Sequence, residues 1–155
     1  MKVEDIMTRE VQCCGPDTHL ATAAKMMWDN DCGALPVLNV EGRVLGMITD
    51  RDICMSVSTK NKPASEITVW ETITPKAYTC HPSEDIHTAL DIMKRERVHR
   101  LPVIDDDGIL QGIIALNDII LGAGEAKGRK TSDVSCEDVL RALKAISAHR
   151  VLVGI

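Results

Sequence analysis

The sequence has almost no aromatic side chains and no long apolar run. Its 155 residues include no phenylalanine, two tryptophans and one tyrosine. Because 45% of the residues are nevertheless hydrophobic, we expect an aliphatic core in an ordinary globular protein. No apolar stretch reaches the roughly 18 residues that a membrane-spanning helix needs, and no secretory signal is present. We therefore expect a cytoplasmic protein that does not bind a membrane.

An excess of positive charge and closely paired cysteines are also missing. The formal net charge of −5 argues against general binding to nucleic acids, which depends on lysine and arginine. The six cysteines show no C-x-x-C spacing, which predicts neither a metal site nor a redox pair. We interpret Cys14 and Cys80 as small buried hydrophobic residues, and free thiols suit a reducing compartment. No nucleophile elbow, phosphate-binding loop or dinucleotide fingerprint is present, so we do not expect an enzyme.

The chain does contain an internal repeat. Two segments match at an offset of sixty-six residues with no insertion or deletion. The tripeptide Leu-Pro-Val recurs at 35–37 and 101–103, and Asp-Ile recurs at 52–53 and 118–119. Such self-similarity indicates a duplicated structural unit, and two copies form a pair rather than a solenoid. The sequence therefore predicts two units related by a pseudo-twofold axis.

Each copy predicts the same series of strand, helix, strand, strand and helix, which is a mixed α/β (α+β) fold. Apolar residues at helical spacing follow Thr18, a predicted N-cap, and the second copy repeats the same face. In the first copy we expect strands at 11–14, 34–38 and 44–49 and a second helix at 50–57; in the second copy the last three elements fall at 101–104, 110–115 and 116–121. The two copies therefore each contain a hairpin followed by a helix.

The domain organisation follows from this repeat. We expect a first unit at residues 1–58, a linker at 59–68, a second unit at 69–123 and a tail at 124–155. Residues 124–133 are expected to be loose, and Ser135 to Asp138 resembles a capping box that opens a helix. That helix presents Val139, Leu143 and Ile146 on one face. It packs on its own body or on a partner subunit, or it has a specific effector role.

The ordered set of motifs resembles a tandem pair of CBS domains, named after cystathionine beta-synthase, over about residues 3 to 123. The resemblance rests on Val3 to Thr8, on both Leu-Pro-Val strands and on Gly46 to Ile53 with their counterparts. It implies two units packed sheet to sheet as a Bateman module. It also implies that the clefts between them bind an adenine-containing ligand, AMP, ADP or ATP ahead of S-adenosylmethionine or NAD. Such modules often pair into homodimers.

One set of candidate binding residues lies where a strand is expected to run into a helix. Thr49 and Asp52 lie beside backbone N–H groups that attract phosphate at a helix N-terminus. A threonine hydroxyl can donate to phosphate, and an aspartate can accept two hydrogen bonds from a ribose diol. By resemblance, Thr49 and Asp52 occupy the phosphate and ribose positions of the family, and Ile48 and Arg51 from the same stretch complete the set. The alternative is that Thr49 and Asp52 only cap the helix.

The second copy differs in its candidate residues. Asp118 keeps the place of Asp52, but Ala115 replaces Thr49, and the second copy carries His99-Arg100 where the first has Gly33-Ala34. The His-Arg pair resembles the phosphate-contacting strand in the gamma subunits of AMP-activated protein kinase. Arginine can hold phosphate through two parallel hydrogen bonds, and histidine adds charge near neutral pH. The alternative for Arg100 is a solvated charge at a strand edge.

These differences lead to one hypothesis for the site and two for the function. One strong site combines Thr49 and Asp52 with His99 and Arg100, and the mirror site around Asp118 binds phosphate weakly. The leading function is a stand-alone regulatory module that senses an adenine nucleotide and transmits its occupancy to a regulated partner. The alternative is a structural or oligomerisation module without a ligand, and cysteine spacing disfavours a redox protein.

Overall fold

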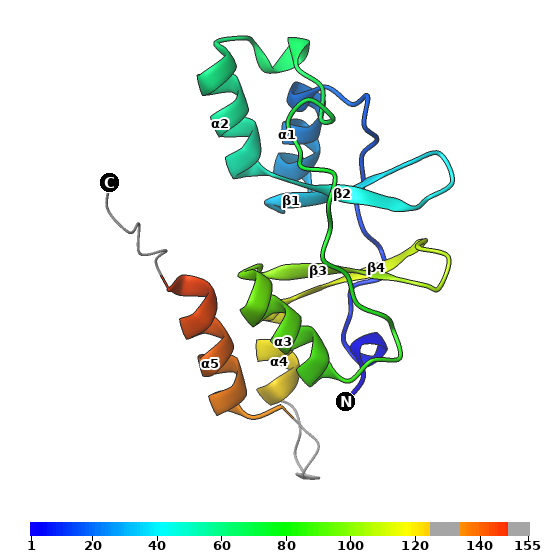
Figure 1. Cartoon of the computed structure of the whole chain (residues 1–155), viewed down its shortest axis with the longest axis vertical. Helices are drawn as coiled ribbons and strands as arrows, with labels where there is room; N and C mark the ends of the chain where they lie inside the picture. The colour runs from blue at the N-terminus through cyan, green and yellow to red at the C-terminus, as the bar shows by residue number, and fades with distance from the viewer. Residues whose placement is uncertain (125–133, 149–155) are drawn as a thin grey trace. The chain divides into compact units, whose positions relative to one another are not determined.

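A computed structural model describes residues 1–124 and 134–148 of the chain (Figure 1). Its elements in chain order are the 3₁₀ turn η1 (Val3–Asp5), α1 (Leu20–Asp29), β1 (Ala34–Leu38), β2 (Val44–Thr49), α2 (Asp50–Lys60), the 3₁₀ turn η2 (Ala64–Glu66), α3 (Ile86–Glu96), β3 (Arg100–Ile104), β4 (Leu110–Ala115), α4 (Leu116–Gly124) and α5 (Cys136–Ser147). The strands pair as β1 with β2 and β3 with β4. The predicted mixed fold of helices and small antiparallel sheets is confirmed.

The chain divides into two compact units. The α1/α2 unit contains Arg9–Ala77 and Ile104–Gly112, and the α3/α4 unit contains Met1–Thr8, Tyr78–Val103 and the described residues from Ile113 on. The N-terminal residues join the α3/α4 unit through backbone hydrogen bonds: the Val3 N–H donates to the Glu84 carbonyl at 2.9 Å. The tip of the second hairpin joins the α1/α2 unit, where the Val44 N–H donates to the Gly108 carbonyl at 3.2 Å. Each unit is therefore assembled from both copies of the repeat.

Each predicted hairpin is present, but the strand expected before α1 is short. In the first hairpin Ala34 pairs with Thr49, and the register shifts between Val37 and Leu38. At residues 11–14 only Cys14 pairs, through one parallel bridge to Val37. The Cys14 N–H donates to the Pro36 carbonyl at 3.0 Å, and the Leu38 N–H donates to the Cys14 carbonyl at 2.9 Å. This segment extends the hairpin by a single residue rather than by a full strand.

Three helix boundaries differ from the predicted ones, and one of them is the end of α4, which lies at Gly124 rather than at Leu121. The N-cap of α1 is His19, because the Thr18 hydroxyl instead accepts a hydrogen bond from the Gly15 N–H at 3.1 Å. The prediction of Thr18 as N-cap is therefore wrong by one residue. Helix α2 continues past Val57 to Lys60 and ends at Asn61, whose φ of 52° is left-handed. Asparagine adopts this conformation more readily than most residues, so it ends the helix at low cost.

The core is aliphatic, as predicted, and the aromatic residues contribute little to it. Each unit has its own cluster, and repeat-related residues hold the same positions in both. Among the fully buried members are Leu20, Leu35, Ile48 and Ile67 in the α1/α2 unit and Ile86, Met93, Leu101 and Ile114 in the α3/α4 unit. Trp28 and Trp70 are 87% and 49% exposed. Among the described residues, no helix is both long and apolar enough to cross a membrane.

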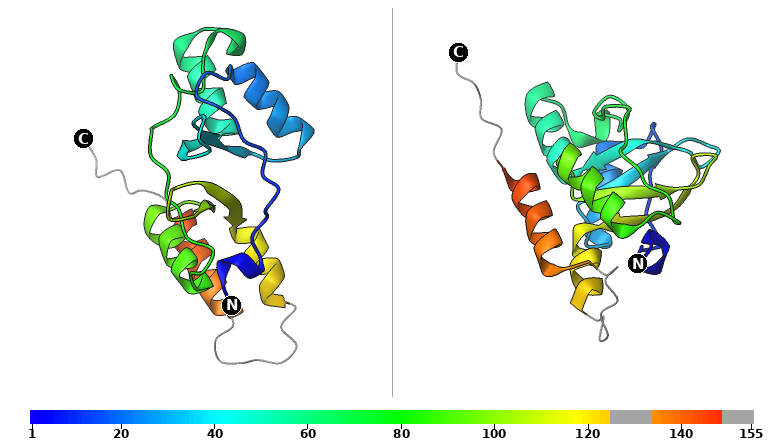
Figure 2. Two further views of the ribbon diagram at one scale, coloured as in Figure 1. Left: turned by 90° about the vertical axis from the view of Figure 1, so that its right-hand side faces the viewer. Right: turned by 60° about the horizontal axis from the view of Figure 1, so that its bottom comes forward.

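Helix α5 packs on the α3/α4 unit. Its N-cap is Ser135, whose hydroxyl accepts from the Asp138 N–H at 3.2 Å, while the Asp138 carboxylate accepts from the Ser135 N–H at 3.0 Å. The predicted capping box is confirmed, as is the apolar face: Val139 and Ile146 are buried and Leu143 is half-buried in the core cluster. In Figure 2 the helix runs alongside α3, and it also contacts α4. Residues 125–133 of the segment predicted to be loose lie outside the described residues.

Cys14 and Cys80 occupy repeat-related positions in the two cores. Both are buried and unpaired, which confirms their interpretation as small hydrophobic residues. Burial raises the pKa of the Cys14 thiol to about 11, with a smaller contribution from Cys13. Burial also raises the pKa of the Cys80 thiol to about 12, with Glu84 adding to the effect. Both groups are therefore neutral thiols at physiological pH.

We expect the two buried thiols to resist alkylation in the folded protein. The reactive species is the thiolate, which burial disfavours, whereas Cys54 and Cys136 are exposed. Iodoacetamide at pH 8 should label Cys54 and Cys136 first, and peptide mass spectrometry should find Cys14 and Cys80 unmodified until denaturant is added. Equal labelling of all four residues without denaturant would contradict the burial described above.

Truncation of a core side chain should destabilise the protein strongly. Leu35 is fully buried, so Leu35→Ala should lower the free energy of unfolding by about 2–5 kcal/mol. Val40, at the tip of the first hairpin, is fully exposed, and Val40→Ala should change it by less than about 0.5 kcal/mol. Urea unfolding followed by circular dichroism measures both. Equal effects of the two substitutions would show that Leu35 is not in the core.

Candidate functional site

The junction between β2 and α2 carries the first set of predicted binding residues. The Thr49 hydroxyl accepts from the Asp52 N–H at 3.1 Å, and the Asp52 carboxylate accepts from the Thr49 N–H at 2.9 Å. This capping box is the alternative that the sequence left open. The Thr49 hydroxyl can still bind a ligand, because an oxygen that accepts a hydrogen bond keeps its own proton to donate. Capping and ligand binding are therefore compatible at this junction.

The junction between β4 and α4 has half of this arrangement. The Asp118 carboxylate accepts from the Ala115 N–H at 2.8 Å, as Asp52 does for Thr49. Because Ala115 has no side-chain hydroxyl, it cannot accept a hydrogen bond from the Asp118 N–H. This junction therefore has only one of the two hydrogen bonds of a capping box. In each copy a backbone bond also ties the helix start to the residue before the hairpin: Leu116 N–H to the His99 carbonyl at 2.9 Å, and Asp50 N–H to the Gly33 carbonyl at 3.1 Å.

The predicted basic residues lie at the start of β3. His99 and Arg100 are exposed, and the bond between His99 and Leu116 places them beside the first turn of α4. His99, Arg100 and Asp118 thus gather in the α3/α4 unit. The exposure of Arg100 agrees with a solvated charge and also leaves its guanidinium accessible to an anion.

The remaining predicted residues lie in the α1/α2 unit. Arg51 is exposed in the first turn of α2, next to Thr49 and Asp52. Ile48 is fully buried in the core, so only its backbone is available for a ligand contact. The structure groups the predicted residues by unit, and the combined site that draws on both units stays a prediction.

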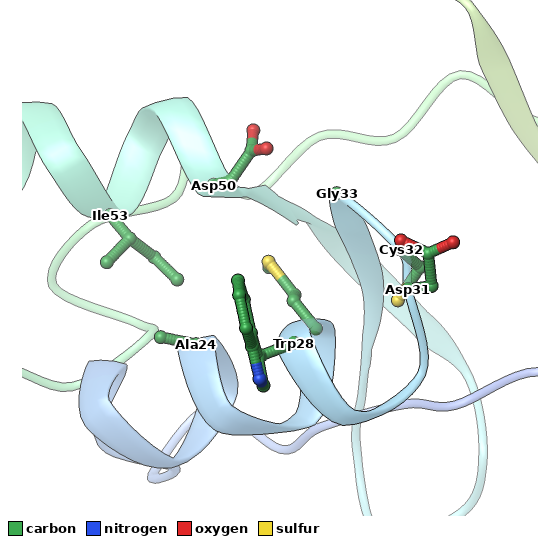
Figure 3. Close-up of a pocket in the computed structure, with 8 residues that line it drawn as sticks. Ala24, Trp28, Asp31, Cys32, Gly33, Asp50 and Ile53 are labelled. Carbon is green, nitrogen blue, oxygen red and sulfur yellow. The ribbon is translucent and has the colours of Figure 1, made fainter.

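A pocket of about 370 Å³ in the α1/α2 unit was missed by the sequence reasoning (Figure 3). It lies between α1, α2 and the start of β1 and is lined by Ala24, Met27, Trp28, Asp31, Cys32, Gly33, Asp50 and Ile53. Its walls are mainly apolar, with two carboxylates at Asp31 and Asp50. Gly33 lies close to Asp50: a Cβ there would lie 3.0 Å from an Asp50 carboxylate oxygen, so the Asp50 side chain would have to shift slightly. The sequence signal that could have indicated this pocket is Trp28, which directly follows Met27, the last residue of the predicted buried helix face.

A second hollow of about 760 Å³ lies along residues 13–18 of the same unit and the start of the hairpin turn near Asn39 and Val40. It contains none of the predicted binding residues. No group of three or more histidine, cysteine, aspartate or glutamate side chains is placed to hold a metal ion in residues 1–124 and 134–148.

Comparison with known proteins identifies the repeat. A profile described as CBS domain matches residues 3–58 and 64–123. The CBS domain-containing protein YhcV of Bacillus subtilis is 27% identical over 88% of this chain and 97% of its own length.

Solved structures agree in fold. A crystal structure of hypoxic response protein I with two coordinated zinc ions is 32% identical, with a TM-score of 0.72 over 78% of this chain and 98% of that one. The CBS domain pair of protein MJ0100, in complex with 5-methylthioadenosine and S-adenosyl-L-methionine, is 25% identical, with a TM-score of 0.71 over 82% of this chain and 98% of that one. From its matched motifs and fold, this chain belongs to the CBS domain family and carries two tandem CBS repeats.

Proposed function

We propose that this chain is a regulatory module that binds an adenine-containing nucleotide with residues from both repeats. Occupancy would reach a regulated protein through a change in conformation or in the packing of a homodimer. The observation that carries the proposal is the junction of β2 and α2, where the Thr49 hydroxyl, which keeps its own proton, adjoins the Asp52 carboxylate. The adenosine-containing ligands of the MJ0100 pair support the same ligand class.

The chemistry of the candidate residues favours a phosphate-bearing ligand. The Thr49 hydroxyl, at the positive end of α2, suits a phosphate oxygen, and Asp52 suits a ribose diol. His99 and Arg100 supply cationic donors of the kind that hold phosphate. S-adenosylmethionine has no phosphate and carries a positive sulfonium, so it would not use this pair. AMP, ADP and ATP are therefore preferred to S-adenosylmethionine, and NAD, with its pyrophosphate, is intermediate.

The difference between the two junctions supports unequal sites. The set of Thr49, Asp52, His99 and Arg100 offers a hydroxyl, a carboxylate and two cationic groups. The complementary set around Asp118 has alanine in place of the hydroxyl and Gly33-Ala34 in place of the cations. The first set should therefore bind phosphate more tightly than the set around Asp118. The same proposal includes a cytoplasmic location, which the six unpaired cysteines favour.

Nucleotide binding should raise the thermal stability. At about a hundred times the dissociation constant, a ligand adds about 2.7 kcal/mol to the free energy of unfolding. For a chain of this size, we expect a rise of about 5–10 °C in Tm with AMP, ADP or ATP in differential scanning fluorimetry. Arg100→Ala and Asp52→Asn should each remove most of this rise, while Arg141→Ala, on the exposed side of α5, should keep it. No shift with any of these nucleotides, S-adenosylmethionine or NAD would favour the alternative of a ligand-free structural module.

Isothermal titration with AMP or ATP should find one dominant site for each chain. The second site should bind at least about tenfold more weakly, because it lacks charge-assisted hydrogen bonds worth about 1.5–3 kcal/mol each. Ala115→Thr restores a hydroxyl at the second junction and should strengthen that weak site. Two sites of equal affinity in the unmodified protein would contradict the asymmetry.

A further inference from the structure

Helix α5 contacts α3 through a polar side chain at each of its ends. Just past the end of α5, the Ala148 carbonyl accepts a hydrogen bond from the Arg97 guanidinium, which follows α3, at 3.4 Å. At the start of both helices, Nε2 of His87 lies 3.7 Å from a carboxylate oxygen of Asp138. The two helices therefore run in the same direction, side by side as Figure 2 shows. The apolar face of α5 is buried between these two contacts.

His87 lies between two carboxylates that belong to different helices. Its Nδ1 is 2.7 Å from Oδ1 of Asp85, the N-cap of α3, and the same oxygen accepts from the His87 N–H at 2.9 Å. Its Nε2 faces Oδ2 of Asp138, in the first turn of α5. The imidazole therefore bridges the first turns of the two helices.

Both carboxylates keep their charge over the range in which a histidine titrates. The backbone hydrogen bond from His87 is the main cause that lowers the pKa of the Asp85 carboxyl below its usual value. Hydrogen bonds from the Ser135 hydroxyl and N–H lower the pKa of the Asp138 carboxyl in the same way. Each group is therefore an anion from about pH 5 to 8, where histidine changes its charge.

The protonation state of His87 decides whether its contact with Asp138 is attractive. An ionised Asp85 can only accept a hydrogen bond, so the short contact to Nδ1 requires a proton on that nitrogen. In the neutral ring Nε2 then carries a lone pair, which faces a negative oxygen of Asp138. A second proton makes Nε2 a donor and places a positive charge between two negative ones. Only the protonated imidazole therefore attracts both helices.

We propose that His87 is a pH switch, which holds the start of α5 against α3 when its imidazole is protonated and loosens it when the imidazole is neutral. The contribution is present at the acidic end of the histidine range and is lost as the pH rises through that range. The Arg97 contact at the other end of α5 does not change, because a guanidinium stays protonated. This inference does not depend on the nucleotide site.

The other charged groups on the elements around His87 leave this sign unchanged. Three ion pairs lie on the N-terminal segment, α3 and α5: Lys2 with Glu4, Lys94 with Asp91, and Arg141 with Glu137. Each pair brings one charge of either sign, so its net effect on the imidazole is small. Glu84 adds a negative charge before α3, while the Met1 amino group lies 3.8 Å from Oδ2 of Asp85 and lessens the attraction on that side. The partial positive charge of the two helix N-termini is offset by their capping carboxylates.

The switch biases the docking of α5 and does not decide it alone. The side chains of His87 and Asp138 are 43% and 34% exposed, and ion pairs that water reaches contribute modestly. We therefore expect the opening of α5 to change by about two- to fivefold. Val139 of α5 shares one core cluster with Ile86 and Leu90 of α3. The pH should thus set how often this apolar side of α3 becomes accessible.

Hydrogen exchange in the full-length protein tests the switch. Mass spectrometry of α5 peptides at pH 6 and pH 8, corrected for intrinsic exchange rates, gives the equilibrium constant for local opening of the helix. The unmodified protein should open α5 about two- to fivefold more at pH 8 than at pH 6. His87→Gln is neutral at both pH values and should remove this difference. Asp138→Asn should reduce it as well, because its amide can still cap the helix but carries no charge.

Two control variants separate the switch from other effects of pH. His19→Gln removes an exposed histidine of the α1/α2 unit and should keep the full difference. Arg97→Ala removes the contact at the other end of α5 and should increase opening by the same factor at both pH values. Circular dichroism of each variant checks that the fold is kept.

Three results would overturn the proposal. The first is equal opening of α5 at the two pH values, or greater opening at pH 6, in the unmodified protein. The second is a difference that persists in full in His87→Gln. The third is a change that peptides of β3 share equally with those of α5, because it would reflect the stability of the whole unit rather than the release of one helix.

Discussion

One backbone hydrogen bond in each repeat fixes the corner on which the rest of the local chemistry depends. It joins the first residue of α2 or α4 to the carbonyl of Gly33 or His99, just before the paired strand. Because this bond lets the strand turn directly into a helix, it places the first turn of that helix at the edge of the hairpin. It also brings the loop after α1 or α3 against the next helix. The candidate nucleotide residues and the pocket beside Trp28 therefore share a single geometric origin.

The elements with strong periodicity were predictable, and those set by competing local bonds or long-range pairing were not. The helix faces and hairpins follow from apolar spacing that both copies repeat. The start of α1 could not be placed, because the Thr18 hydroxyl was available both to a helix and to the turn at Gly15. The pairing of Val3 with Glu84 leaves no periodic trace in the sequence. The sequence therefore places residues 1–8 in the first unit, whereas in the structure they pack with the α3/α4 unit.

The candidate site was predictable in residue type but not in surroundings. Thr49 and Asp52 were expected either to cap a helix or to bind a ligand, and the structure confirms the cap while leaving the hydroxyl proton available. The pocket beside Trp28 was not predicted, because the pattern that marks a buried helix face stops at Met27. Whether Trp28, the next residue, is exposed depends on whether another segment packs over it. The spacing of apolar residues within one copy of the repeat does not show this.

The two helix pairs differ in charge at the place where α5 ends. Arg97 and Leu116 on the α3/α4 pair stand where the α1/α2 pair has Asp31 and Asp50. The Arg97 guanidinium donates to the carbonyl of Ala148, just past the end of α5, at 3.4 Å. An aspartate in that place has no proton to donate to a carbonyl and repels the negative end of a helix. The repeated elements therefore give the two helix pairs opposite charge at corresponding positions.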